Sequence, residues 1–221
     1  MDLTPSKKYF LISLPLLLLL STALVFTSLA RWLGKEWGYL LGFAFYDLLW
    51  CIAVPLLLLG KDGFLSPFRE ERPLFRRENW LPVLLVTVPI VVSFFSNFIP
   101  NVASTPLLVI MIGIPAATIN GTCEEMLWLG LYVKAFPNKV ILGLLYPAIG
   151  FALWHFSPHL IFPAEGNIFV FVIFTLILGL SYGWAAYRTG SIRWTALSHS
   201  LIGILAFGVP LSTAILGLVS P

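Results

Sequence analysis

The sequence predicts an all-α membrane protein, a polytopic bundle of about seven transmembrane helices with a polar chamber inside the membrane. Of its 221 residues 59% are hydrophobic and 10% charged, and the mean hydropathy is +0.94. A soluble domain of this length could not cover so much apolar surface. The apolar runs are continuous and reach the roughly 20 residues that span a bilayer. They lack the alternation of barrel strands, so helices are expected.

We expect one domain over residues 1–221, with spans at Phe10–Ala30, Tyr39–Leu59, Trp80–Ile99, Leu107–Phe136, Val140–Phe162, Ile168–Tyr187 and Trp194–Val219. The first span follows Lys7 and Lys8 and ends in small residues, a pattern that also fits a cleaved signal peptide. A retained span that acts as its own signal is the interpretation that its length favours. The second and third spans flank one sizeable charged loop, KDGFLSPFREERPLFRREN, which is expected to be a connector.

The last four spans carry the irregular features. Leu107–Phe136 is long for one crossing, and Pro115 and Asn120-Gly121 predict a kink or break before its glutamates. In the next span Pro158 interrupts the helix after His155. Gly179 and Gly183 form a small-xxx-small pair, which is typical of close helix packing. The final span contains His199.

Basic residues predict the orientation. With the N-terminus in the cytoplasm, every Lys and Arg except Arg31 and Lys35 falls on the inner side. This asymmetry follows the positive-inside rule and, with seven spans, places the C-terminus outside. The positive net charge therefore reflects membrane topology, and we expect the bilayer and no nucleic acid as a partner. A multi-pass protein of the cell membrane is the predicted localisation.

Two adjacent acids, Glu124 and Glu125, lie inside an otherwise apolar span. A carboxylate at this depth costs several kcal/mol unless it is solvated, paired or protonated, so a functional role is the first hypothesis. Neighbours on a helix diverge by about 100°, so only one of the two can point straight into a given cavity. The i+4 position of Glu125 is Leu129, which offers no ion pair. We therefore expect Glu125 to be protonated or bonded to another helix, and paired structural carboxylates remain the alternative.

Two histidines accompany the acids in other spans, His155 in FALWHF and His199 in ALSHSLIG. Either one alone could simply bridge two helices through a hydrogen bond. Together with a glutamate they suit a zinc-type site or a carboxylate-activated water with imidazole helpers. His159, one turn after His155, is a weaker candidate ligand. Straight helices would leave these side chains at different depths, so tilts or kinks must bring them together.

Taken together, the motifs resemble the CPBP family of intramembrane proteases, which includes CAAX prenyl proteases and bacteriocin-processing enzymes. That family shows EExxxR, FxxxH and HxxxN on successive segments. Here Glu124-Glu125, then Phe151 and His155, then His199 follow in the same order, and the resemblance covers about residues 107–203. Two positions depart from the pattern, because Leu129 replaces the arginine and Gly203 replaces the asparagine.

The resemblance implies an intramembrane endopeptidase that hydrolyses peptide bonds of membrane-associated substrates, prenylated ones among them, near the cytoplasmic face. Glu124 would activate water with His155 as its companion, Glu125 would support the site, and His199 with the residue four positions later would stabilise the oxyanion. The family implies either a metal-free glutamate or one divalent metal such as zinc held by Glu124, His155 and His199. The alternatives are a non-catalytic relative serving as an immunity or scaffold protein, and a small proton-coupled transporter.

Overall fold

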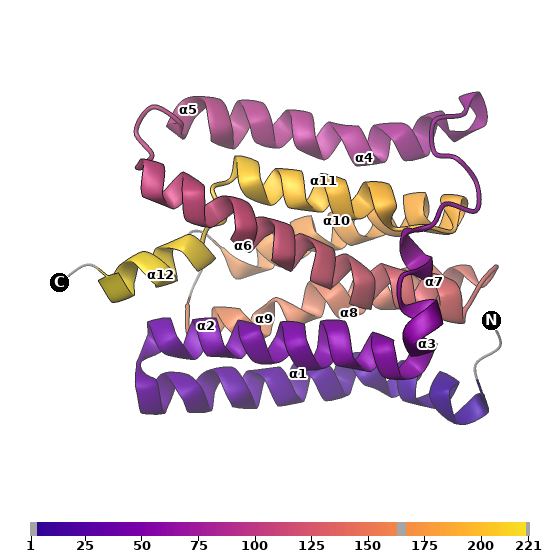
Figure 1. The fold of residues 1–221 in the computed structure, drawn as a ribbon, viewed down its shortest axis with the longest axis horizontal. Helices are drawn as coiled ribbons and strands as arrows, with labels where there is room; N and C mark the ends of the chain where they lie inside the picture. The colour runs from indigo at the N-terminus through magenta and orange to yellow at the C-terminus, as the bar shows by residue number, and fades with distance from the viewer. Residues whose placement is uncertain (1–3, 163–166, 220–221) are drawn as a thin grey trace.

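The computed structural model describes residues 4–162 and 167–219, and within these ranges it contains helices and no strands. Its helices run along one long axis and form a bundle (Figure 1). Six segments are long and apolar enough to cross a membrane: Pro5–Leu33, Lys35–Phe64, Arg77–Asn101, Leu107–Ala135, Ile141–His159 and Ile168–Thr189. The predicted fold class is therefore confirmed, and the chain is an integral, multi-pass membrane protein.

The first two of these segments form a hairpin. It consists of α1 (Pro5–Leu33), then α2 (Lys35–Phe45), a π-helical stretch η1 (Tyr46–Ala53) and α3 (Val54–Phe64). The third segment contains α4 (Trp80–Ser93), the π-helical η4 (Phe94–Phe98) and α5 (Ile99–Asn101). The fourth contains α6 (Leu107–Glu125), the π-helical η5 (Met126–Gly130) and α7 (Leu131–Ala135). The fifth contains η6 (Ile141–Leu145), α8 (Tyr146–Trp154) and α9 (Phe156–His159), and the sixth is α10 (Ile168–Thr189).

The predicted seventh span is not one helix. It is divided into α11 (Arg193–Leu205) and α12 (Leu211–Val219) by a turn in which Phe207 and Gly208 have left-handed backbone angles. Pro210 has no N–H to donate to a helical ladder, which favours an interruption at this point. α11 and α12 still follow one another along the bundle (Figure 1). The start of α1 and the end of α12 lie at opposite ends of the molecule.

The irregularity expected before the glutamates lies after them. α6 is helical from Leu107 to Glu125, with Pro115 inside it, and the π-helical turn η5 begins at Met126. Single π-turns occur frequently at functional sites, because the extra residue shifts the direction of the side chains that follow. The two glutamates thus occupy the last turn of a regular helix, immediately before such a shift.

The charged loop between α3 and α4 packs over one end of the bundle. The backbone N–H groups of Glu71 and Arg72 both donate to Thr189 O, at 3.1 and 3.0 Å. Ile192 N donates to Pro67 O at 2.8 Å, and Trp194 Nε1 donates to Glu70 at 2.6 Å. These bonds tie residues 67–72 to the end of α10 and the start of α11. We call residues 67–72 the strap.

Candidate active site

The closest helix pair around the site is α6 and α11, and small residues make that approach possible. A Cβ at Gly121 would lie 2.8 Å from Ser200 N and 3.1 Å from His199 C, and a Cβ at Gly203 would lie 2.8 Å from the Ala117 Cβ. Gly113, Ala117 and Gly121 recur every four residues and so share one face of α6. Glu125 is the next residue on that face. The glycines therefore bring His199 of α11 within reach of the acids of α6.

His199 bridges the two glutamates. Its Nδ1 lies 3.0 Å from Glu125 Oε1 and its Nε2 lies 3.5 Å from Glu124 Oε2. Both carboxylates are buried, with 2% and 4% of their surface exposed. A neutral imidazole donates from only one nitrogen, and the shorter contact places that proton on Nδ1, toward Glu125. Nε2 then faces Glu124 as an acceptor, so these two groups are placed to share a proton.

The two acids have different surroundings, as their positions on the helix predicted. Glu124 lines a large cavity, whereas Glu125 is not among the residues that line it. Glu125 is bonded to another helix through His199, which is one of the two outcomes expected for it. Its second oxygen, Oε2, is buried without a hydrogen-bond partner. Glu125 therefore orients His199, and Glu124 is the acid available to a bound molecule.

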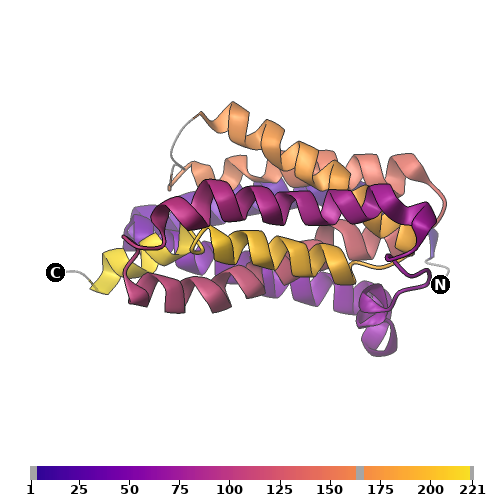
Figure 2. The same cartoon turned by 90° about the horizontal axis from the view of Figure 1, so that it is seen from above.

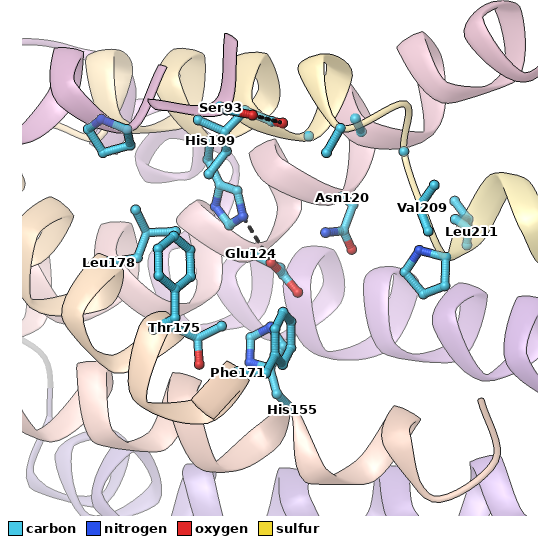
Figure 3. A pocket seen from close by; sticks show the side chains of 18 of the residues that line it. Ser93, Asn120, Glu124, His155, Phe171, Thr175, Leu178, His199, Val209 and Leu211 are labelled. Atoms are coloured by element: carbon cyan, nitrogen blue, oxygen red, sulfur yellow. Dashed lines mark hydrogen bonds and ion pairs between the residues drawn. The ribbon is translucent and has the colours of Figure 1, made fainter. Parts of the chain in front are cut away.

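His155 lies at the C-terminal end of α8 and lines the same cavity as Glu124 and His199 (Figure 3). Its Nδ1 lies 2.9 Å from Phe151 O one turn earlier, so Nδ1 carries the proton and Nε2 remains an acceptor. Its ring makes edge contacts with Phe151, Trp154 and Phe171. The Phe151–His155 spacing recognised in the sequence thus supplies both the acceptor and a packing partner that fix the imidazole.

The cavity has a volume of about 740 Å³ and mostly apolar walls. α4, α6, α10 and α11 contribute most of its lining, and Val209 and Leu211 lie at the end distant from His199 (Figure 3). His159 also lines it. Asp47, in η1, does not line it, although its Oδ1 is buried without a hydrogen bond. The predicted polar chamber is thus a mostly apolar cavity, to which several of the surrounding helices each contribute a few polar groups.

Asn120 is a site residue to which the sequence reasoning gave little weight. It lines the cavity one turn before Glu124 and its side chain interacts with that carboxylate. Its Oδ1 is buried without a partner. The i, i+4 spacing of Asn120 and Glu124 on one helix was the available signal. An amide in this position can donate to an oxygen that develops negative charge beside Glu124.

The two departures from the family motif have local explanations. Leu129 is 2% exposed and packs in an apolar cluster with Met126, Tyr182 and Ile192. The position therefore helps to hold η5 against α10 and has no space for a longer cation. Gly203 faces Ala117 so closely that an asparagine there would push α6 and α11 apart. His199 replaces the missing arginine as the partner of Glu125.

The sequence also allowed a metal held by Glu124, His155 and His199. Across the described residues, no group of three or more His, Cys, Asp or Glu side chains converges in a way that could hold a metal ion. His155 Nε2 is free to act as a ligand, but His199 faces a carboxylate with each of its ring nitrogens. This arrangement does not fit a zinc site, which needs three converging protein ligands.

The sequence matches a known family model. The family model "Type II CAAX prenyl endopeptidase Rce1-like" matches residues 104–205. This range covers the motif-bearing segments from α6 to α11. No match was found among curated proteins or among solved structures.

Proposed function

We propose that this chain, in which residues 104–205 belong to the Rce1-like family, is an intramembrane endopeptidase that uses a glutamate-activated water. The observation that carries the proposal is the Glu125–His199–Glu124 chain on the wall of a cavity large enough for a peptide. Family membership supports a CAAX protease-type membrane protein.

In this mechanism Glu124 takes a proton from a water held between its carboxylate and the imidazoles. General-base catalysis requires the base within hydrogen-bond reach of that water, and Glu124 presents its carboxylate to the cavity. The hydroxide attacks the scissile carbonyl carbon, and the carbonyl oxygen becomes an oxyanion. The proton then passes from Glu124 to the amide nitrogen, which leaves as an amine.

The other side chains position the two imidazoles and stabilise the oxyanion. Glu125 holds His199 through Nδ1, which fixes Nε2 toward the reacting groups. His155 is fixed in the same way by Phe151 O. Asn120 is the donor we assign to the oxyanion in place of the family asparagine, which is Gly203 here. Removal of such a donor typically raises the activation barrier by about 2.7–4 kcal/mol.

The deciding experiment is digestion of a library of membrane peptides by the purified, reconstituted protein. Wild type should cleave, and Glu124→Gln should fold but not cleave, because an amide cannot accept the water's proton. A chelator should leave cleavage unchanged. Equal activity of wild type and Glu124→Gln would exclude this mechanism.

A non-catalytic relative is the second candidate, and the departures at Leu129 and Gly203 favour it. In that case the same cavity would bind a peptide without cutting it, and neither variant nor wild type would yield products. For proton-coupled transport we find no such specific observation, because Glu124 and Glu125 lie at one site and are bridged by the same histidine.

A further inference from the structure

Residues 69–78 carry almost balanced charge in the sequence. They comprise the end of the strap and the short segment that leads into α4, and their sequence REERPLFRRE contains four arginines and three glutamates. Composition alone therefore predicts little net charge for this segment. The structure separates the two signs, because two of the acids bond to the helical bundle and most of the arginines do not.

The two glutamates of the strap bond to side chains of the helices beneath it. Glu70 Oε1 accepts from Trp194 Nε1, near the start of α11, at 2.6 Å. It also accepts from the backbone N–H of Leu74 at 3.2 Å. Glu71 forms an ion pair with Lys134 in the last turn of α7. The hydrogen bonds of one acid and the charge of the other are thus used within the protein.

Three arginines of the same segment have no such partner. Arg69, Arg72 and Arg77 are exposed, and among the described residues their side chains form no ion pair and no hydrogen bond. Arg76 differs, because it lies 3.7 Å from Glu78, and both of those side chains are exposed. The segment therefore presents three guanidinium groups whose charge no acid of the described chain compensates.

The segment lies where the headgroups of the bilayer are expected. It joins the membrane-spanning segments Lys35–Phe64 and Arg77–Asn101 and crosses one end of the bundle (Figure 1). Two aromatic residues beside the arginines, Phe75 and Trp80, are each 63% exposed. An exposed tryptophan next to basic residues at the end of a span is typical of the boundary between hydrocarbon and headgroups.

We propose that Arg69, Arg72 and Arg77 form a binding face for the phosphate groups of anionic phospholipids, which we call the arginine face. A guanidinium group holds a phosphate through two parallel hydrogen bonds, which an ammonium group cannot do. The rings of Phe75 and Trp80 contact the acyl chains of the same lipids. Because two spans end here, a lipid headgroup is the anion that this face meets, whereas an acidic protein would have to be brought to it. The arginine face does not depend on peptidase activity.

The test measures the binding of a fluorescent phosphatidylglycerol to the purified chain in micelles of a neutral detergent, with fluorescent phosphatidylcholine as the uncharged comparison. One variant combines Arg69→Gln, Arg72→Gln and Arg77→Gln. A matched variant replaces the same three residues by Lys, which keeps the charge and removes the bidentate geometry. The control variant combines Arg31→Gln and Lys35→Gln, which removes exposed cations at the opposite end of the bundle. Unfolding temperatures in neutral detergent verify that each variant is folded.

Each cation near an anionic lipid surface contributes roughly a factor of five to the affinity. We therefore expect the Gln variant to bind phosphatidylglycerol about 100-fold more weakly than the wild type, the Lys variant to lie between them, and the control to match the wild type. Equal affinity of the wild type for both lipids, or unchanged affinity in the Gln variant, would overturn the proposal. A Lys variant as tight as the wild type would refute recognition by the guanidinium groups.

Two competitors distinguish a lipid from other anions at the arginine face. Inorganic phosphate at the concentration of the lipid should not displace phosphatidylglycerol, and displacement would assign the face to free phosphate. Poly-glutamate should bind more weakly than phosphatidylglycerol. Tighter binding of poly-glutamate would assign the face to an acidic protein and overturn the proposal.

Discussion

The bond between His199 and Glu125 is the contact that decides what each glutamate does. It joins α11 to α6 and leaves Glu124 facing the cavity. Interhelical hydrogen bonds in membranes contribute about 0.6 kcal/mol on average and up to about 1.7 kcal/mol. The bond therefore contributes little to the stability of the protein, and its main effect is to orient His199.

We predict that a double-mutant cycle of Glu125→Ala and His199→Ala gives a coupling energy of about 0.6–1.7 kcal/mol in unfolding measurements. Glu125→Gln retains an acceptor for Nδ1, so for that variant we expect lowered kcat with a nearly unchanged KM, whereas Glu124→Gln abolishes turnover. The same cycle with Glu124→Ala serves as the comparison. A larger coupling for Glu124 than for Glu125 would contradict the assigned roles.

Asn120 supplies a second test at the level of single residues. Asn120→Ala removes the amide next to Glu124, and we expect kcat to fall by about 10²–10³-fold if that amide stabilises the oxyanion. Thr118→Ala is the control, since Thr118 is exposed on the same helix and donates only to Ile114 O. An unchanged kcat in Asn120→Ala would remove this residue from the mechanism.

Among the elements, the close packing of α6 against α11 fixes the position of His199 relative to Glu124 and Glu125. A methyl group at Gly121 would meet the backbone of Ser200 and His199, which cannot move aside without displacing α11. Overpacking of this kind typically costs about 1–3 kcal/mol. We predict that Gly121→Ala lowers stability by that amount and abolishes activity. Retention of full activity would show that the close approach is not required.

The same pair predicts how the family asparagine can be restored. Gly203→Asn alone should destabilise the protein, because its Cβ would lie 2.8 Å from the Ala117 Cβ. Combining it with Ala117→Gly removes the obstructing methyl and should recover most of the lost stability. If the asparagine then donates to the oxyanion, hydrolysis should exceed that of the wild type. Equal melting temperatures of the single and double variants would contradict this packing argument.

For the whole molecule, the orientation in the membrane determines which side of the bilayer each end of the cavity faces. The basic residues predict that the N-terminus and the strap are cytoplasmic and that the C-terminus is external. Reporter fusions at Arg72, in the strap, and at Pro221, the last residue, should therefore report opposite sides of the membrane. If both report the same side, the chain makes an even number of crossings after Arg72 and the prediction is wrong.

Much of this architecture could be predicted from the sequence alone, because membrane insertion depends on local properties of the chain such as the length of each apolar segment. Apolar length defines the spans, and an acid or histidine inside a span is costly enough to indicate a site without any knowledge of its neighbours. Hence Glu124, Glu125, His155 and His199 could be named, and the divergence of adjacent glutamates on a helix could be predicted.

Only the tertiary structure could show which side chains meet. The pairing of His199 with Glu125 depends on how closely α6 and α11 approach, and that approach depends on Gly121 and on the Ala117–Gly203 contact, which join distant parts of the sequence. The division of the last span at Gly208 and the position of the strap over one end arise from packing between helices. Hydropathy and the spacing of polar residues describe each helix separately. The direction of the cavity depends on how the helices tilt against one another, which these patterns do not specify.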